Sequence, residues 1–177
     1  MTGALIVVAA CTLALLVVVV AGRVRNRDRR AVVLEELDAR LAGAGSVLSG
    51  ATPDGAPLDV ALADSADRTL LAFLSSSCVT CRGLWAEIGT GLSEALGRGT
   101  RVVVVTEDPA DERPDAVRAL APPALPVLMS SATWRRYGVT VAPFFVLVEG
   151  SSGRVLAAGA AADGAAVRRL ARPATRG

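Results

Sequence analysis

The chain has 177 residues, a length that suits one domain of ordinary size together with a further segment. Its net charge of +2 and its aromatic content of 3% give neither the charged field nor the stacking platforms of a nucleic-acid-binding protein. All 19 basic residues are Arg, so the chain contains no His and no Lys. This composition excludes His-activated nucleophiles, His-bearing metal sites, P-loop lysines and Schiff bases. Carboxylate acid–base catalysis and thiol chemistry are the main possibilities that remain.

The first predicted element is a transmembrane helix over residues 1–22. Residues 3–22 (GALIVVAACTLALLVVVVAG) carry no charge, and about 20 apolar helical residues span the roughly 30 Å of a bilayer core. A cleaved signal peptide is the alternative, although the start of the chain lacks its positive charge and the apolar run is long for one. A lipoprotein site at Cys11 fits less well, because too little apolar sequence precedes it. We therefore expect the lipid bilayer to be the partner of this segment.

A basic flank follows the apolar segment. Five arginines lie within eight positions, offset only by Asp28: Arg23, Arg25, Arg27, Arg29 and Arg30. The positive-inside rule predicts that this flank, and the domain after it, stay in the cytoplasm. Residues 31–41 have apolar side chains at helical spacing, and glycines follow them. We assign residues 23–50 to a basic flank, a short helix and a linker.

Residues 51–177 are predicted to form one domain in which strands and helices alternate. A turn-rich lead-in covers residues 51–57. Residues 69–74 (TLLAFL) suit a buried strand, residues 81–96 have the length and the apolar stripe of a helix, and residues 101–105 (RVVVV) read as a β-branched strand. Residues 111–120 are expected to form a helix and residues 127–129 a short strand.

An antiparallel hairpin and a helix are predicted to end the domain. Residues 144–148 (FFVLV) and 154–158 read as strands joined by a Gly/Ser turn, and residues 164–170 fit a terminal helix. Alternating strands and helices followed by a hairpin imply an α/β fold, with a mixed central sheet and helices on both of its faces.

Two cysteines lie where the first strand of this domain gives way to its first helix. Cys78 and Cys81 are spaced C-x-x-C, with Val79 and Thr80 between them. This context places Cys78 at the helix N-cap and Cys81 within disulfide reach of it. Free N–H groups and the positive helix end then favour a thiolate at Cys78, which attacks a disulfide, and Cys81 resolves the mixed disulfide. Two thiols suffice for this exchange, so we expect no cofactor.

Other uses of the Cys pair fit the sequence less well. A zinc site needs four ligands, and Cys11 in the apolar segment is the only further Cys in the chain. We therefore expect no metal. A purely structural disulfide inside one helical turn would close a very small loop and stabilise little.

A proline immediately before the strand at residue 144 is the second informative element. Prolines are common at strand starts, but this one lies about 60 residues after the Cys pair. A cis Ala142–Pro143 bond would bring its loop beside the Cys pair. It would also leave the Ala142 N–H and C=O free to pair with an extended segment. We therefore predict that Ala142 and Pro143 bind substrate.

These motifs resemble the thioredoxin superfamily. The resemblance covers roughly residues 52–170 and rests on TLLAFLSSSCVTC with its following helix, RVVVVTEDP and YGVTVAPFFVLVEGSSGRVL. The anchor, the TPDGAPLDV lead-in and the lone Cys pair are most similar to the membrane-tethered TlpA/ResA branch. FLSSSCVTC is also similar to the methylamine-utilisation accessory protein, which is implicated in maturing a disulfide-rich dehydrogenase subunit. The resemblance implies a thioredoxin fold, with Cys78 the attacking thiol, Cys81 the resolving thiol and Pro143 the cis-proline.

The chain departs from thioredoxin proper around the motif. Thioredoxin carries an aromatic residue before its first Cys and Gly-Pro between the two, where this chain has Ser77 and Val79-Thr80. Thioredoxin also has a buried Asp that helps to deprotonate the resolving thiol, and Ala72 stands at that position. Glu87 and Glu107 are candidate substitutes, although solvated surface charge is the simpler interpretation of both.

Two functions from different classes remain. The first is a membrane-tethered thiol–disulfide oxidoreductase that acts on protein clients and a membrane redox partner, in the maturation of extracytoplasmic redox proteins. The alternative is a non-enzymatic thioredoxin-fold binding or scaffold module at the membrane, which the missing Asp favours. Copper delivery by this fold needs a His that the chain lacks. We expect a single-pass protein of the cell membrane. The resemblance places its domain outside the cytoplasm, whereas the basic flank at residues 23–30 places it inside.

Overall fold

The computed structural model describes residues 34–39, 41, 47–63, 67–97 and 99–172. The transmembrane helix predicted over residues 1–22 lies outside these ranges, and so does the basic flank at residues 23–30. Within the ranges, no helix combines the length and the apolar character that crossing a bilayer requires. The membrane anchor therefore stays a prediction.

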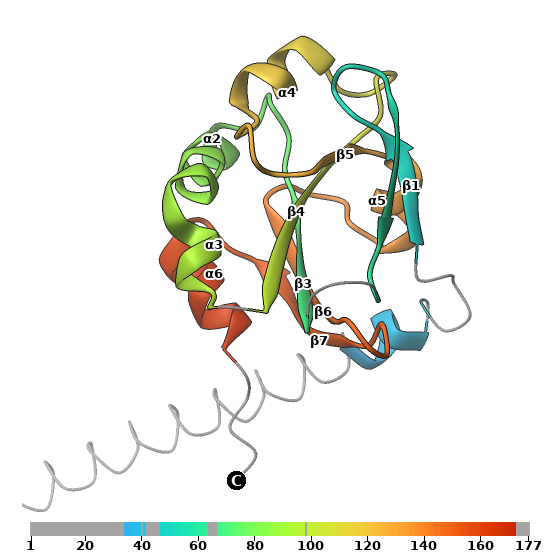
Figure 1. Cartoon of the computed structure of the whole chain (residues 1–177), viewed down its shortest axis with the longest axis vertical. Coiled ribbons are helices and arrows are strands. Elements are labelled where there is room, and N and C mark those ends of the chain that lie inside the picture. The colour runs from blue at the N-terminus through green and yellow to red at the C-terminus, as the bar shows by residue number, and fades with distance from the viewer. Residues whose placement is uncertain (1–33, 40, 42–46, 64–66, 98, 173–177) are drawn as a thin grey trace, which may run out of the picture.

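A mixed sheet forms the centre of the described domain (Figure 1). Its strands are β1 (Val47–Ala51), β2 (Pro57–Ala61), β3 (Arg68–Phe73), β4 (Thr100–Thr106), β5 (Val127–Met129), β6 (Phe144–Glu149) and β7 (Val155–Ala160). Their spatial order is β2-β1-β5-β4-β3-β6-β7. The central strands β3, β4 and β5 are parallel, while β6 and β7 on one side and β1 and β2 on the other are antiparallel. The predicted mixed sheet is confirmed.

Helices cover both faces of this sheet, as predicted. They are a short helix at residues 34–39, α2 (Val79–Glu87), the π-helical turn η1 (Ile88–Leu92), α3 (Ser93–Ala95), α4 (Pro114–Leu120), α5 (Ser131–Arg136) and α6 (Gly164–Ala171). Side chains of α2, η1, α4 and α6 pack into one apolar cluster, whereas α5 and the helix at residues 34–39 pack into the other. Figure 1 shows α2, α3 and α6 together on one side of the strands and α5 on the other.

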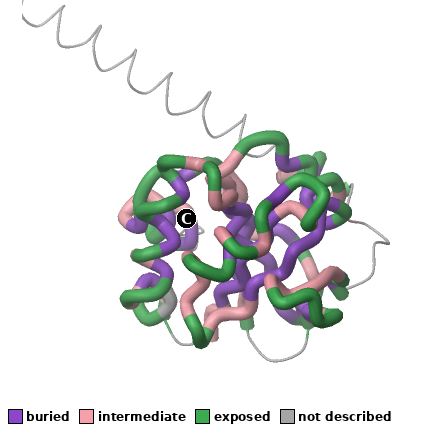
Figure 2. The backbone as a smooth tube through the Cα atoms, turned by 90° about the horizontal axis from the view of Figure 1, so that it is seen from above, coloured by how far each residue is buried: buried purple, intermediate pink, exposed green. Residues whose placement is uncertain are grey.

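The central strands are buried on both faces. Leu70 and Ala72 of β3 belong to the cluster under α2, while Leu71 and Phe73 belong to the cluster under α5, and all four are 0% exposed. Successive residues of a strand point to opposite faces, so a strand covered on both faces needs a continuous apolar run. In Figure 2 the backbone in the middle of the domain is accordingly coloured as buried (purple).

The register of β3 brings three loops together. Phe73, the last residue of β3, pairs with Val105 near the end of β4, and on its other side it pairs with Phe144, the first residue of β6. Because β4 is parallel to β3, the loops that follow both strands leave the same edge of the sheet. Because β6 is antiparallel to β3, the segment that precedes β6 lies at that edge too.

Three parts of the fold differ from the sequence prediction. Strand β1 begins at Val47, within the predicted linker, and pairs along its length with β2. The predicted lead-in is the turn of this hairpin, closed by the Thr52 N–H, which donates to the Ala56 carbonyl at 2.8 Å. Helix α5 was not predicted, since it has six residues and its apolar face is short. The helix predicted from residue 81 begins at Val79, and Gly91, with φ of 131°, interrupts it.

A substitution at Gly50 tests how closely the β1 hairpin packs on the sheet. A Cβ at this position would meet the Met129 carbonyl oxygen, and it would also lie 2.8 Å from Leu128 Cδ1. We expect Gly50→Ala to lower the free energy of unfolding by about 1–3 kcal/mol, because a backbone atom cannot move aside. Gly83 in α2 has no atom within 4 Å of such a Cβ, so Gly83→Ala should stabilise by about 0.5–1 kcal/mol. Urea unfolding measures both, and equal midpoints for the two variants would contradict the packing.

Candidate active site

Cys78 caps the N-terminus of α2. Its backbone is extended, with φ of −79° and ψ of 119°, and its Sγ accepts a hydrogen bond from the Cys81 N–H at 3.2 Å. An N-cap side chain satisfies an amide that has no partner within the helix. Cys78 is partly exposed, and both thiols are free in this structure. The sulfur that the sequence analysis predicted to attack is therefore reachable from solvent at a helix N-terminus, where negative charge is favoured.

Cys81 lies behind Cys78 and is fully buried, at 0% exposure. The pKa of the Cys81 thiol is raised from 9.0 to about 12, chiefly by burial and also by the hydrogen bond and charge of Cys78, while a backbone hydrogen bond from Ser75 acts to lower it. The two thiols of the motif thus have opposite environments. Cys81 keeps its proton near neutral pH as long as Cys78 lies beside it unmodified.

The proline loop lies against the Cys pair. The Ala142–Pro143 peptide bond is cis. The Cys78 thiol donates to the Ala142 carbonyl oxygen, with an Sγ to O distance of 3.7 Å. This carbonyl was expected to be free, but the loop lies close enough for the sulfur to engage it. Phe144, two residues after Ala142, pairs with Phe73. This strand pairing brings Ala142 to Cys78, although the two residues are 64 positions apart in sequence.

The dipeptide between the cysteines faces outward. Val79 is 86% exposed and Thr80 is exposed too. On the proline loop, Val141 is 63% exposed. Large exposed apolar side chains indicate an interaction site mainly when several lie together. Val79 and Val141 are two such exposed side chains, and they lie on the two segments that flank the Cys78 sulfur.

The carboxylates considered as substitutes for the missing Asp have other roles. Ala72 is 0% exposed and packs in the same cluster as Cys81, so no carboxylate lies at that position. Glu87 accepts a hydrogen bond from the Gly164 N–H at 2.9 Å and thereby joins α2 to the start of α6. Glu107 is half-buried, and burial raises the pKa of its carboxyl, as do Asp111, Glu112 and Asp108 in the following loop.

Sequence reasoning missed Glu112. This residue precedes α4 and is 8% exposed. Its Oε1 accepts from the Ser76 hydroxyl at 2.6 Å and from the Arg113 N–H at 3.0 Å, and its Oε2 accepts from the Ser76 N–H at 3.0 Å. Burial acts to raise the pKa of the Glu112 carboxyl, but hydrogen bonds from Ser76, Arg113 and Ser75 outweigh it, so the pKa is lowered. Glu112 is thus an ionised carboxylate that holds the loop before Cys78.

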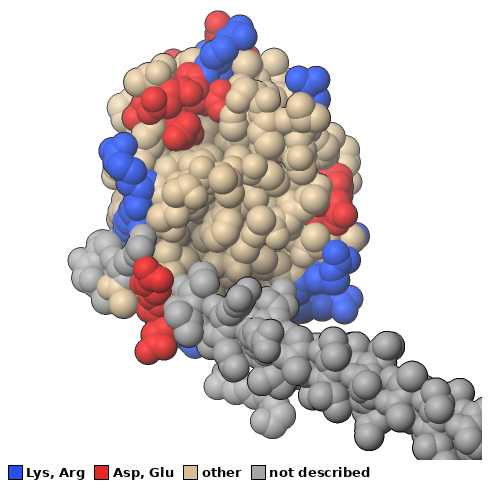
Figure 3. All heavy atoms as spheres, turned by 180° about the vertical axis from the view of Figure 1, so that it is seen from behind, with Lys and Arg blue, Asp and Glu red and all other residues tan. Residues whose placement is uncertain are grey.

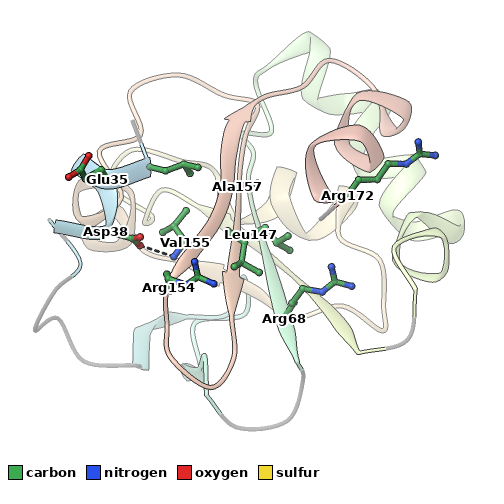
Figure 4. Close-up of a pocket in the computed structure, with 10 residues that line it drawn as sticks. Glu35, Asp38, Arg68, Leu147, Arg154, Val155, Ala157 and Arg172 are labelled. Carbon is green, nitrogen blue, oxygen red and sulfur yellow. Dashed lines mark hydrogen bonds between the residues drawn. The ribbon is translucent and has the colours of Figure 1, made fainter. Parts of the chain in front are cut away.

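A separate hollow lies at the other end of the sheet. It has a volume of about 520 Å³ and an apolar floor of Leu147, Val155, Leu156 and Ala157 (Figure 4). Arg68, at the start of β3, lines it, whereas Cys78 follows the end of that strand. The arginines that line it do not converge on one point in Figure 4. The hollow therefore does not belong to the thiol site.

In the described ranges, no three Cys, Asp or Glu side chains gather closely enough to hold a metal ion. The rear view of the surface shows a broad uncharged area with charged side chains at its margins (Figure 3). The candidate site at this end of the domain is the Cys pair with the proline loop.

Comparison with solved structures identifies the fold. The exposed lipoprotein thioredoxin Etrx1 of Streptococcus pneumoniae aligns with a TM-score of 0.57 and 18% identity, over 71% of this chain and 97% of that chain. A secreted disulfide oxidoreductase of Mycobacterium tuberculosis, described as homologous to E. coli DsbE, aligns with a TM-score of 0.54 and 21% identity, over 76% and 97%. StoA from Bacillus subtilis gives 0.55 and 14%, over 71% and 96%.

These likenesses place the domain in one class. The chain has a thioredoxin-like α/β fold, as the resemblance of its motifs implied. No protein-family model matches the sequence, and no curated protein matches it either. At these identities the structural likeness establishes the fold and not the activity.

The buried Glu112 carboxylate makes the stability of the fold depend on pH. Because the pKa of Glu112 is lowered in the folded chain, its contribution is complete above the ordinary value of 4.5 and is lost as the pH falls through the lower folded value. We expect Glu112→Gln to destabilise by about 1–3 kcal/mol near neutral pH, with a difference that shrinks in acid. Thermal unfolding across this range measures it, with Glu94→Gln, an exposed acid of α3, as control. A difference that does not depend on pH would contradict the assignment.

Proposed function

We propose that this chain is a thiol–disulfide oxidoreductase that acts on protein clients through Cys78 and Cys81. The observation that carries the proposal is the asymmetry of the pair. One sulfur is reachable at a helix N-terminus beside a proline loop, and the other is buried directly behind it. Several solved structures of similar fold are described as disulfide oxidoreductases or thiol:disulfide interchange proteins, which supports the same activity.

The exchange proceeds in two balanced steps. The Cys78 thiolate attacks one sulfur of a client disulfide, forms a mixed disulfide and releases the first client thiolate. The Cys81 thiolate then attacks the Cys78 sulfur, forms the Cys78–Cys81 disulfide and releases the second client thiolate. Two electrons pass from the pair to the client, and the reverse sequence oxidises a client dithiol.

The first step prepares Cys81 for the second. The hydrogen bond with Cys78 and the charge on Cys78 both raise the pKa of the Cys81 thiol. Once Cys78 is tied into a mixed disulfide, its sulfur carries no charge and attracts the Cys81 proton less. The pKa of Cys81 then falls toward the value set by burial and by the backbone hydrogen bond from Ser75. Burial, the largest cause of the raised pKa, remains in the mixed disulfide, so the first step removes only the part of the shift that Cys78 causes.

The clients are extended protein segments with apolar side chains near the disulfide. Val79 and Val141 are exposed on the two segments that flank Cys78, and an apolar client residue would cover them. The Ala142 carbonyl is held by a weak thiol contact of 3.7 Å, which a backbone N–H of the client can replace.

The proposal also includes the membrane. The apolar run at residues 3–22 would tether the domain, and the resemblance to the TlpA/ResA branch supports a domain outside the cytoplasm, where disulfides form. The lipoprotein and the secreted protein of similar fold support the same location. There the chain would act with a membrane redox partner in the maturation of extracytoplasmic redox proteins.

The activity is tested in the full chain with Cys11→Ala, which removes the third thiol, and in two further Cys variants of that parent. In a redox titration with thiol labelling and mass spectrometry, we expect Cys78 and Cys81 to interconvert as one two-electron couple. Reduced Cys81→Ser should accumulate a mixed disulfide with a disulfide-bonded protein client, because the variant has no second thiol to resolve it. Cys78→Ser should lose client exchange and leave the buried Cys81 unlabelled.

The outcome also separates the two classes of function. If the pair never interconverts, or if Cys78→Ser retains full function in the source cell, the scaffold alternative replaces the oxidoreductase. The absence of a carboxylate at Ala72 is the observation that favours that alternative.

A reporter placed after Gly177 tests the location. We expect an alkaline phosphatase fusion to be active and a β-galactosidase fusion to be inactive, because the first folds outside the cytoplasm and the second inside it. Removing residues 1–22 should move the protein out of the membrane fraction and abolish phosphatase activity. The opposite pair of activities would mean that the arginines at residues 23–30 set the orientation.

A further inference from the structure

The loop between β3 and α2 is tied to a distant carboxylate. Residues 75–77 connect the end of β3 to Cys78. Inside the loop, Ser75 Oγ lies 2.9 Å from Ser77 Oγ and accepts a hydrogen bond from the Ser77 N–H at 3.2 Å. These bonds are exposed and local. The anchor from outside the loop is Glu112, whose two carboxylate oxygens accept from the Ser76 hydroxyl and the Ser76 N–H.

The same loop supplies a donor to the resolving thiol. A backbone hydrogen bond from Ser75 favours the thiolate form of Cys81. Ser75 is the residue before Ser76, so the direction of its N–H depends on where the adjacent peptide is held. The clamp on Ser76 is therefore one peptide unit away from the donor to Cys81.

We propose that Glu112 is a positioning residue for the resolving thiol: its carboxylate holds Ser76 and so keeps the Ser75 N–H directed at the Cys81 sulfur. The inference rests on the proposed function and deepens it, because it assigns control of the second exchange step. Glu112 touches neither cysteine in the described contacts and acts through the loop.

The electrostatic surroundings support this role. Cys78 is the titratable group with a direct Coulombic effect on Cys81, and in the mixed disulfide that effect is gone. Glu107, Asp108, Asp111 and Arg113 surround Glu112 on its own segment. The carboxylate is nevertheless kept ionised by three short hydrogen bonds at 2.6 to 3.0 Å. It is an acceptor that persists through the neutral range.

The test separates the two sulfurs kinetically. The full chain with Cys11→Ala is reduced and mixed with excess dithiobis(nitrobenzoate), a disulfide that releases a coloured thiolate. Attack by Cys78 releases the first thiolate at a rate proportional to the reagent concentration. Attack by Cys81 on the resulting mixed disulfide releases the second at a rate that does not depend on it. The two phases report the two cysteines in one experiment.

We expect Glu112→Ala to slow the second phase about tenfold near neutral pH, which corresponds to a pKa of the resolving thiol about one unit higher. The pH profile of that phase should shift upward, while the first phase stays within about twofold of the parent protein. Glu112→Gln keeps one oxygen acceptor and should restore part of the rate. Ser76→Ala loses the hydroxyl donor alone and should give a smaller effect in the same direction.

Asp111→Asn is the matched control, since it removes one negative charge from the same loop without a contact to Ser76. It should leave both phases unchanged, and far-UV circular dichroism establishes that each variant is folded. If Glu112→Ala does not fold, Glu112→Gln and Ser76→Ala decide. A second phase at the parent rate in the folded variants, or equal slowing of both phases, overturns the proposal. A parent protein that releases no second thiolate would instead overturn the proposed function itself.

Discussion

The pairing of β3 with both of its neighbours is the constraint on which the thiol site depends. Phe73 lies opposite Val105 on one side and Phe144 on the other. Each residue of a strand advances about 3.3 Å, so a slip of one residue would separate Cys78 from Ala142 and Ser76 from Glu112. Because both faces of β3 are apolar, alternation alone does not set this register. Ala72 packs in the cluster under α2, and on the opposite face Phe73 meets Trp134 edge-on, with ring centroids 5.6 Å apart.

The parts of the fold that were predictable are those in which local sequence and burial agree. The strands at β3, β4 and β6 are continuous apolar runs because helices cover both of their faces. The hairpin of β1 and β2 was hidden because β2 begins with Pro57 and carries Asp59 at an exposed position, features that read as a turn. Helix α5 had a local signal that went unused. Its N-cap Ser130 accepts from the Thr133 N–H, and two arginines lie in its last turn.

The candidate site was predictable where its parts are local and not where they depend on pairing. Cys78 and Cys81 lie between the end of a strand and the start of a helix. All the atoms of the N-cap hydrogen bond lie within these four residues, so the local sequence was enough to predict it. Glu112 is 36 positions from Ser76, and only the parallel pairing of β3 and β4 brings the two loops together. In sequence, Glu112 stands among Asp108 and Asp111, and such a group normally reads as solvated charge.

The position of the carboxylate determines what it can do. A carboxyl group at position 72 would lie among the apolar side chains around Cys81, where burial would raise its pKa and let it exchange protons near neutral pH. At position 112 the carboxylate is also buried, at 8% exposure, but hydrogen bonds lower the pKa of the Glu112 carboxyl instead. A group that stays ionised throughout the neutral range is a fixed acceptor and not a proton carrier. With Ala72 in the core, the proposed exchange would therefore rely on a directed backbone N–H at Cys81 and not on a base at position 72.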